Sequence, residues 1–160
     1  MSRGIRILMD NSYYHIVNRG NQKQNIFQEQ ADYEEYAGIL ALYKRKFGIK
    51  LLCYCFMPNH VHLILELQNT KELAKFMQCI TQSYAKWFNL KYNKVGHLWQ
   101  GRFKSMLIEK DNYFLDCVYY VEANPVRAGI VTSPLDYAWS SYKERVFGDK
   151  KGLLNLPDST

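Results

Sequence analysis

Two of the four histidines in this chain, His60 and His62, lie two residues apart in the segment MPNHVHLILEL, residues 57–67. In a β-strand, successive side chains point to opposite faces. The segment would therefore place Val61, Leu63, Leu65 and Leu67 on one face and both imidazoles on the other. Two imidazoles that face the same point are a good pair of ligands for a divalent metal ion. A metal that works on a substrate also needs a third protein ligand.

A candidate for the third ligand lies in DNYFLDCVYYVEAN, residues 111–124, which we expect to form a helix capped by Asp111 and ended by Asn124 and the following proline. Tyr120 and Asn124 are four residues apart, so they lie on one helical face, one turn apart. Tyr119 is rotated by about 100° around the helix axis. If Asn124 reaches a site, the helical phase predicts that Tyr120 reaches it too and that Tyr119 does not. Core or interface packing is the alternative role for such a tyrosine.

The elements before this helix alternate in the order βαββαβ. This order is the split βαβ, ferredoxin-like pattern, an α+β fold whose antiparallel sheet carries its helices on one face. The histidine face would then stay open, and the helix at 111–124 has no obvious place under the sheet. We expect strands at 12–20, 49–56, 60–67 and 103–109, helices at 30–47 and from a cap at Asn69 or Thr70, and a tight connection at Pro58 and Asn59.

The chain has the length of a single domain, residues 1–160, with a core of about 12–125 and a wrapping extension with a short helix at 126–160. None of its four cysteines has zinc-knuckle or CxxC spacing. We therefore interpret Cys53 and Cys55 as small buried side chains in a reducing compartment, in preference to metal ligands.

The formal net charge is +6, which suggests an anionic partner. The aromatics Trp99 and Phe103 stand beside Arg102 and Lys104, a grouping that would suit stacking on bases and binding of phosphates. Core packing is the competing role for Phe103. The sequence offers neither a signal peptide nor a stretch near the roughly 20 apolar residues that span a membrane, so we expect a cytoplasmic protein with no membrane partner.

Several spaced motifs resemble one known family. The segments MPNHVHLIL, GHLWQGRFKS, YVEANPVRAGIV and WSSY occur in this order and resemble the single-tyrosine HUH transposases, which are IS200-like, and most of all the REP-associated tyrosine transposases. The resemblance runs from about Tyr13 to Tyr142. It implies a ferredoxin-like fold with an added catalytic helix, Mg²⁺ or Mn²⁺ held by two histidines and a polar residue, and a nucleophilic tyrosine on the helix after the sheet.

Carried onto this chain, the resemblance implies that His60, His62 and Asn124 hold the metal and that Tyr120 is the nucleophile. The adjacent Tyr119 leaves the nucleophile ambiguous by one residue, and the helical phase favours Tyr120. Glu66 and Glu122 remain alternative ligands. His15 and His97 are expected to be structural or to face DNA, and no general base for the tyrosine stands out.

The implied function is metal-dependent cleavage and strand transfer of single-stranded DNA through a covalent 5′-phosphotyrosine, at hairpin or palindromic repeat sequences. Bound to DNA, the protein would be associated with the nucleoid. One alternative is a catalytically silent DNA-binding module or domesticated regulator on the same fold. Another is a zinc hydrolase, for which the sequence offers no clear third ligand. The choice between monomer and homodimer is open, as is the DNA sequence recognised. The expected DNA contacts are Arg19, Trp99, Arg102, Lys104 and Arg127.

Overall fold

The structure is a computed structural model that describes residues 9–109, 113–148 and 152–155. Its centre is a four-stranded antiparallel sheet with the strand order β2-β3-β1-β4. This order and these directions are those of the ferredoxin-like α+β fold, so the predicted fold class is confirmed. The strands are β1 (Ser12–Arg19), β2 (Lys50–Met57), β3 (His60–Leu67) and β4 (Lys104–Ile108).

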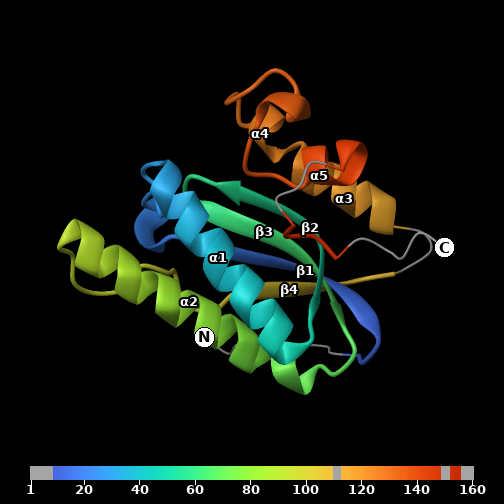
Figure 1. Cartoon of the computed structure of the whole chain (residues 1–160), viewed down its shortest axis with the longest axis horizontal. Helices are drawn as coiled ribbons and strands as arrows, with labels where there is room; N and C mark the ends of the chain where they lie inside the picture. Colours follow the sequence, from blue (N-terminus) through green and yellow to red (C-terminus); the bar gives the residue numbers. More distant parts are fainter. Residues whose placement is uncertain (1–8, 110–112, 149–151, 156–160) are drawn as a thin grey trace.

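Two long helices, α1 (Gln30–Phe47) and α2 (Lys71–Tyr92), cover one face of the sheet (Figure 1). The chain leaves α1 at Gly48, whose φ of 65° is left-handed and therefore suits glycine. Thr70 is the N-cap residue of α2, and the side chain of Asn69, just before it, accepts a hydrogen bond from the Lys71 backbone N–H at 3.0 Å. The regular apolar stripe along α2 packs on the aliphatic side of β3, as its spacing predicted.

We expected the opposite face of the sheet, which carries the histidines, to be open, but the structure shows that it is covered. Helix α3 (Phe114–Glu122) lies across it, and Val118 and Val121 pack on Cys53, Cys55 and Ile64 in a second small core. The physical reason lies in β2, where residues 53–57 are all buried, so this strand is covered on both faces. A strand that reads as a continuous hydrophobic run is typical of a sheet with both faces covered.

The end of α3 differs slightly from the expected one. The helix ends at Glu122, and the short helix α4 (Asn124–Arg127) begins after Ala123, whose φ of −87° and ψ of −3° lie close to helical values. Pro125 is tolerated here because it stands in the first turn of α4. Tyr120 and Asn124 are thus on two consecutive helices that nearly continue one another. The expected cap Asp111 lies outside the described residues.

The C-terminal segment lies along the outer edge of β2. The Phe56 backbone N–H donates to the carbonyl of Trp139 at 2.8 Å, and the Ser141 N–H donates to that of Tyr54 at 2.9 Å. The short helix η2 (Pro134–Asp136) precedes this paired segment in the chain, and helix α5 (Tyr142–Phe147) follows it. The edge strand is therefore covered and does not present free backbone groups there. A further short helix, η1 (Asn21–Lys23), follows β1. No helix within the described residues is both long and apolar enough to cross a membrane.

Candidate active site

The register of the sheet brings histidines and basic residues to one end of the face that α3 covers. His60 stands opposite Arg19, and His62 stands opposite Val17, which in turn stands opposite Lys104 on β4. Residues directly opposite one another on antiparallel strands point to the same face. Two imidazoles, a guanidinium and an ammonium group therefore share this end of the sheet.

Burial keeps both expected metal ligands neutral. His62 is only 4% exposed and His60 is half-buried. Burial lowers the pKa of His60 to about 4, with a further contribution from the positive charge of Arg19. Burial also lowers the pKa of His62 to about 2, with smaller contributions from His60, His15 and two arginines. At neutral pH each ring therefore has an unprotonated nitrogen with which to bind a metal ion.

His15 belongs to the same cluster, although the sequence did not assign it there. Its Nε2 atom lies 2.9 Å from Nδ1 of His62, and the two rings stack with their centroids 5.1 Å apart. His15 is 6% exposed, which favours the structural role of the two that were expected, and burial lowers its pKa to about 4. The alternation of Tyr13, His15 and Val17 along β1 was the available signal. It becomes informative once the ferredoxin-like strand order places β1 beside β3.

Helix α3 places Tyr120 beside this cluster. The Tyr120 ring lies 6.5 Å from the ring of His15 in an edge-on arrangement. The Arg127 guanidinium carbon lies 3.9 Å from the centroid of the Tyr120 ring, and the Arg127 side chain donates to the Tyr120 carbonyl at 2.8 Å. The ring of Tyr119 lies instead near Arg145, at 5.6 Å. Both tyrosines are about half exposed, so their neighbours are what distinguishes them.

Asn124, the expected third ligand, begins α4 and is half-buried. Its amide nitrogen donates to the Val121 carbonyl at 3.4 Å, a long bond, and its carbonyl oxygen is the atom type that Mg²⁺ and Mn²⁺ prefer. Two imidazoles and an amide oxygen are a donor set that fits such an ion. Across the described ranges, no three His, Cys, Asp or Glu side chains are grouped so as to hold a metal.

Of the two carboxylates kept as alternative ligands, Glu122 is held in an ion pair and Glu66 lies far from the histidines. Glu122 is 2% exposed and bonds to Arg145 at 2.5 Å. Glu66 stands opposite Tyr13 near the far end of β3, about 13 Å along the strand from His62 at the rise of an extended chain. The ion pair of Glu122 and the distance of Glu66 from His62 therefore favour Asn124 over either carboxylate as the third ligand.

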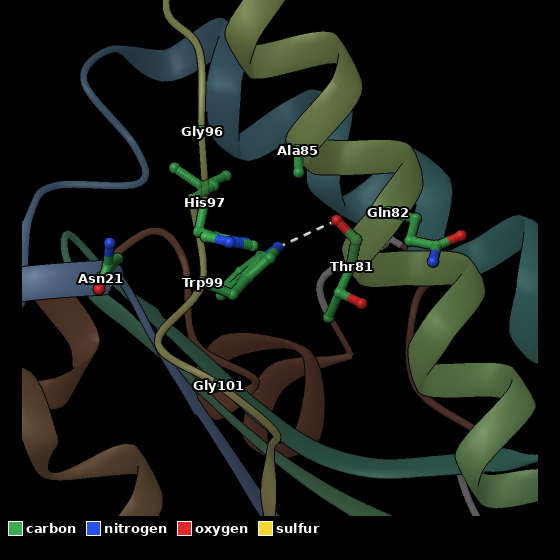
Figure 2. A pocket seen from close by; sticks show the side chains of 9 residues that line it. Asn21, Thr81, Gln82, Ala85, Gly96, His97, Trp99 and Gly101 are labelled. Atoms are coloured by element: carbon green, nitrogen blue, oxygen red, sulfur yellow. Dashed lines mark hydrogen bonds between the residues drawn. The ribbon is translucent and has the colours of Figure 1, made fainter.

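The residues expected to contact DNA fall into two groups. Arg19, Arg102, Lys104 and Arg127 are exposed, and all but Arg102 lie in elements that surround the histidines. Trp99 is 8% exposed and packs into the core beneath α1 and α2. Its indole N–H donates to the Thr81 carbonyl at 3.0 Å, at the wall of a hollow of about 410 Å³ that His97 also lines (Figure 2). Little of the Trp99 ring is left for stacking on a base.

A ferredoxin-like sheet with a histidine pair at one end and a tyrosine helix across the same face is the layout expected above for single-tyrosine transposases. The chain belongs to the IS200-like transposase family, because the family model described as "Transposase IS200 like" matches residues 8–124. A protein of Haemophilus influenzae named as a REP-associated tyrosine transposase is 28% identical. That alignment spans 62% of this chain and 62% of the relative's own length.

Two solved structures share the fold. One is a REP-associated tyrosine transposase bound to a REP hairpin, with a TM-score of 0.77 and 21% identity over 100% of this chain and 94% of that one. The other is a protein of Deinococcus radiodurans R1 described as a transposase. Its TM-score is 0.52, with 16% identity over 75% of this chain and 95% of that one. At these identities the comparisons establish the architecture.

Proposed function

We propose that this protein cuts single-stranded DNA beside a hairpin and joins the cut end to another strand, through a covalent link between Tyr120 and a 5′-phosphate. The observation that carries the proposal is the position of Tyr120. Its ring lies 6.5 Å from that of His15, which is hydrogen-bonded to the expected ligand His62. The alternative tyrosine, Tyr119, has Arg145 as its neighbour instead.

His60, His62 and Asn124 would hold the divalent ion, Mg²⁺ or Mn²⁺. When bound, the ion supplies polarisation of the scissile phosphate and stabilises its developing negative charge. The three residues would fix this ion on the sheet face, in reach of the helix that carries the nucleophile. Arg19, Lys104 and Arg127 would bind neighbouring phosphates of the same strand.

The reaction is a substitution at phosphorus. The Tyr120 hydroxyl oxygen would form a bond to the phosphorus, and the bond between phosphorus and the 3′-oxygen would break. The phenol gives up its proton and the released 3′-oxygen takes one up, so the products are a 5′-phosphotyrosine and a free 3′-hydroxyl. A 3′-hydroxyl from a second strand can attack the phosphotyrosine in turn, which frees Tyr120 and joins the strands. Strand transfer thus needs no external energy source.

Hairpin DNA is the proposed substrate for two reasons. The solved relative with the same fold is described as bound to a REP hairpin, and this chain gathers three exposed basic side chains around its histidines. A phosphate held at the histidine end, between β3 and α3, must come from a strand that can be splayed away from a duplex. A hairpin with single-stranded flanks supplies both a recognisable stem and such a strand.

The test uses a pool of hairpin oligonucleotides with randomised single-stranded flanks, incubated with the protein and Mg²⁺ or Mn²⁺. We expect the parent protein to give a protein–DNA adduct that survives a denaturing gel. The adduct should not form when EDTA is present during the incubation. Tyr120→Phe removes one oxygen atom and should give no adduct, while the matched control Tyr119→Phe should still give one.

The same experiment separates this proposal from the silent DNA-binding module. A parent protein that binds the hairpin pool but forms no adduct with either metal ion would overturn the catalytic proposal and favour the module. An adduct that persists in Tyr120→Phe and is lost in Tyr119→Phe would show that the nucleophile is Tyr119 and that the proposal names the wrong tyrosine.

A further inference from the structure

We propose that His15 is a positioning residue of the metal site, which holds His62 in the tautomer whose Nε2 atom is free to bind the ion. The proposal rests on the proposed function, since it takes His62 as a ligand. The observation behind it is a buried imidazole pair: Nε2 of His15 lies 2.9 Å from Nδ1 of His62, and the two side chains are 6% and 4% exposed.

The hydrogen bond between the two rings can be arranged in only two ways. A neutral imidazole carries one N–H and one bare nitrogen. If His62 accepts the bond at Nδ1, its proton sits on Nε2, and neither nitrogen is available to a metal. If His62 donates from Nδ1, its Nε2 is bare and can bind the ion. Metal binding therefore requires His15 to act as the acceptor.

His60 has a partner that imposes the same choice. Its Nδ1 atom lies 2.6 Å from the side-chain oxygen of Asn59, which can only accept a hydrogen bond. The Nδ1 atom of His60 must then carry the proton, and its Nε2 is bare. Both expected ligands thus have Nδ1 occupied by a partner on the protein, and both would offer Nε2 to the same ion.

The same reasoning excludes His15 as the base that accepts the proton of Tyr120. The two rings are neighbours at 6.5 Å, and a neutral imidazole is a common general base. In the metal-competent arrangement, however, Nε2 of His15 accepts the hydrogen bond from Nδ1–H of His62, and Nδ1 of His15 carries the ring's own proton. His15 therefore acts through His62 and leaves the proton of Tyr120 to another group.

The test compares His15→Gln with His15→Leu. A glutamine can place its amide oxygen near the position of Nε2 and accept the same hydrogen bond, whereas leucine fills similar space and accepts none. The readout is the dissociation constant for Mn²⁺ without DNA, measured by calorimetry, with His60→Ala as the reference for loss of a ligand. Loss of such a supporting partner typically weakens metal affinity by about 10- to 100-fold. We expect a loss in this range for His15→Leu and a change of less than about threefold for His15→Gln.

Equal affinity in the leucine variant and the parent would overturn the proposal, and so would equal losses in leucine and glutamine. If the parent and His60→Ala bind Mn²⁺ equally weakly, the metal site of the proposed function fails and this inference fails with it. If His15→Leu does not fold, nitrogen-15 NMR of the parent loaded with Mg²⁺ decides the matter. His62 should carry its proton on Nδ1 there, and a proton on Nε2 of His62 would contradict the proposal.

Discussion

His15, His60 and His62 form a group of histidines that burial keeps uncharged. Their pKa values are lowered to about 4, 4 and 2 in the folded protein. In the unfolded chain each returns to about 6.5. The folded state therefore binds fewer protons than the unfolded state as the pH falls below that value, and the free energy of unfolding must decrease.

We expect the metal-free protein to lose stability steadily between pH 7 and pH 4.5, measured by urea unfolding at each pH. The half-buried His60 is the best residue to replace, so His60→Gln should reduce the slope of stability against pH. His97→Gln, in an exposed loop, is the matched control and should not reproduce this effect, because it leaves the three histidines of this group in place. A parent protein of constant stability over this range would contradict the burial of uncharged histidines.

At the scale of elements, the position of α3 depends on a buried ion pair at its last residue. Glu122 accepts hydrogen bonds from Arg145 of α5 at 2.5 Å and from the Ser141 hydroxyl at 2.6 Å, and it is 2% exposed. The C-terminal segment thus holds the helix that carries Tyr120. The position of Tyr120, the proposed nucleophile, is therefore coupled to the segment that contains Ser141 and Arg145.

Arg145→Met should destabilise the protein by about 3 kcal/mol, the lower end for a broken buried pair, because a quarter of the arginine side chain is exposed. The loss arises from a carboxylate left buried without its cation. Adding Glu122→Gln to Arg145→Met should recover part of it, as measured by urea unfolding. If Arg145→Met is as stable as the parent, or if adding Glu122→Gln to it does not raise the free energy of unfolding, the ion pair does not hold α3.

The sequence predicted the order of these elements but not how α3 packs. Periodicity located the strands, α1 and α2, because each has a long, regular apolar pattern. Helix α3 has only nine residues, and its pattern does not say against which surface it packs. The buried run in β2 was the indication that both faces of the sheet are covered. The contact between His15 and His62 was not predicted, because it depends on the register between β1 and β3.

The candidate site was predictable where spacing along one element determines it. His60 and His62 share a strand face by simple alternation, and the phase of α3 separates Tyr120 from Tyr119. The role of Trp99 was not predictable from its basic neighbours, because its burial depends on the packing of α2 and the segment 96–101 around it.

On the scale of the whole molecule, the net charge of +6 is less informative than where the positive groups lie. Arg19 and Lys104 share the end of the sheet that carries the histidines, whereas Lys50 stands opposite Glu66 near the other end. If DNA follows the histidine end, only the first group contributes to its binding.

Lys104→Gln and Lys50→Gln make a matched pair, since both residues are exposed lysines in strands. Each phosphate contact with a single strand contributes a slope of about −0.7 to the plot of log affinity against log salt concentration. We expect Lys104→Gln to reduce the magnitude of the slope by about 0.7 for hairpin DNA with a single-stranded flank, and Lys50→Gln to leave it unchanged. Equal effects of the two variants would contradict a localised DNA path, and binding that is insensitive to salt would contradict phosphate contacts altogether.

The central claim is that the histidine end of the sheet and Tyr120 act on the same phosphodiester bond. The most direct test is to isolate the protein–DNA adduct formed with hairpin DNA and Mn²⁺, trim the DNA to one nucleotide with nuclease, and sequence the modified peptide by mass spectrometry. The account predicts a nucleotide attached through its 5′-phosphate to Tyr120, with a free 3′-hydroxyl on the released DNA fragment. A nucleotide on Tyr119 or any other residue, or a link through a 3′-phosphate, would contradict it.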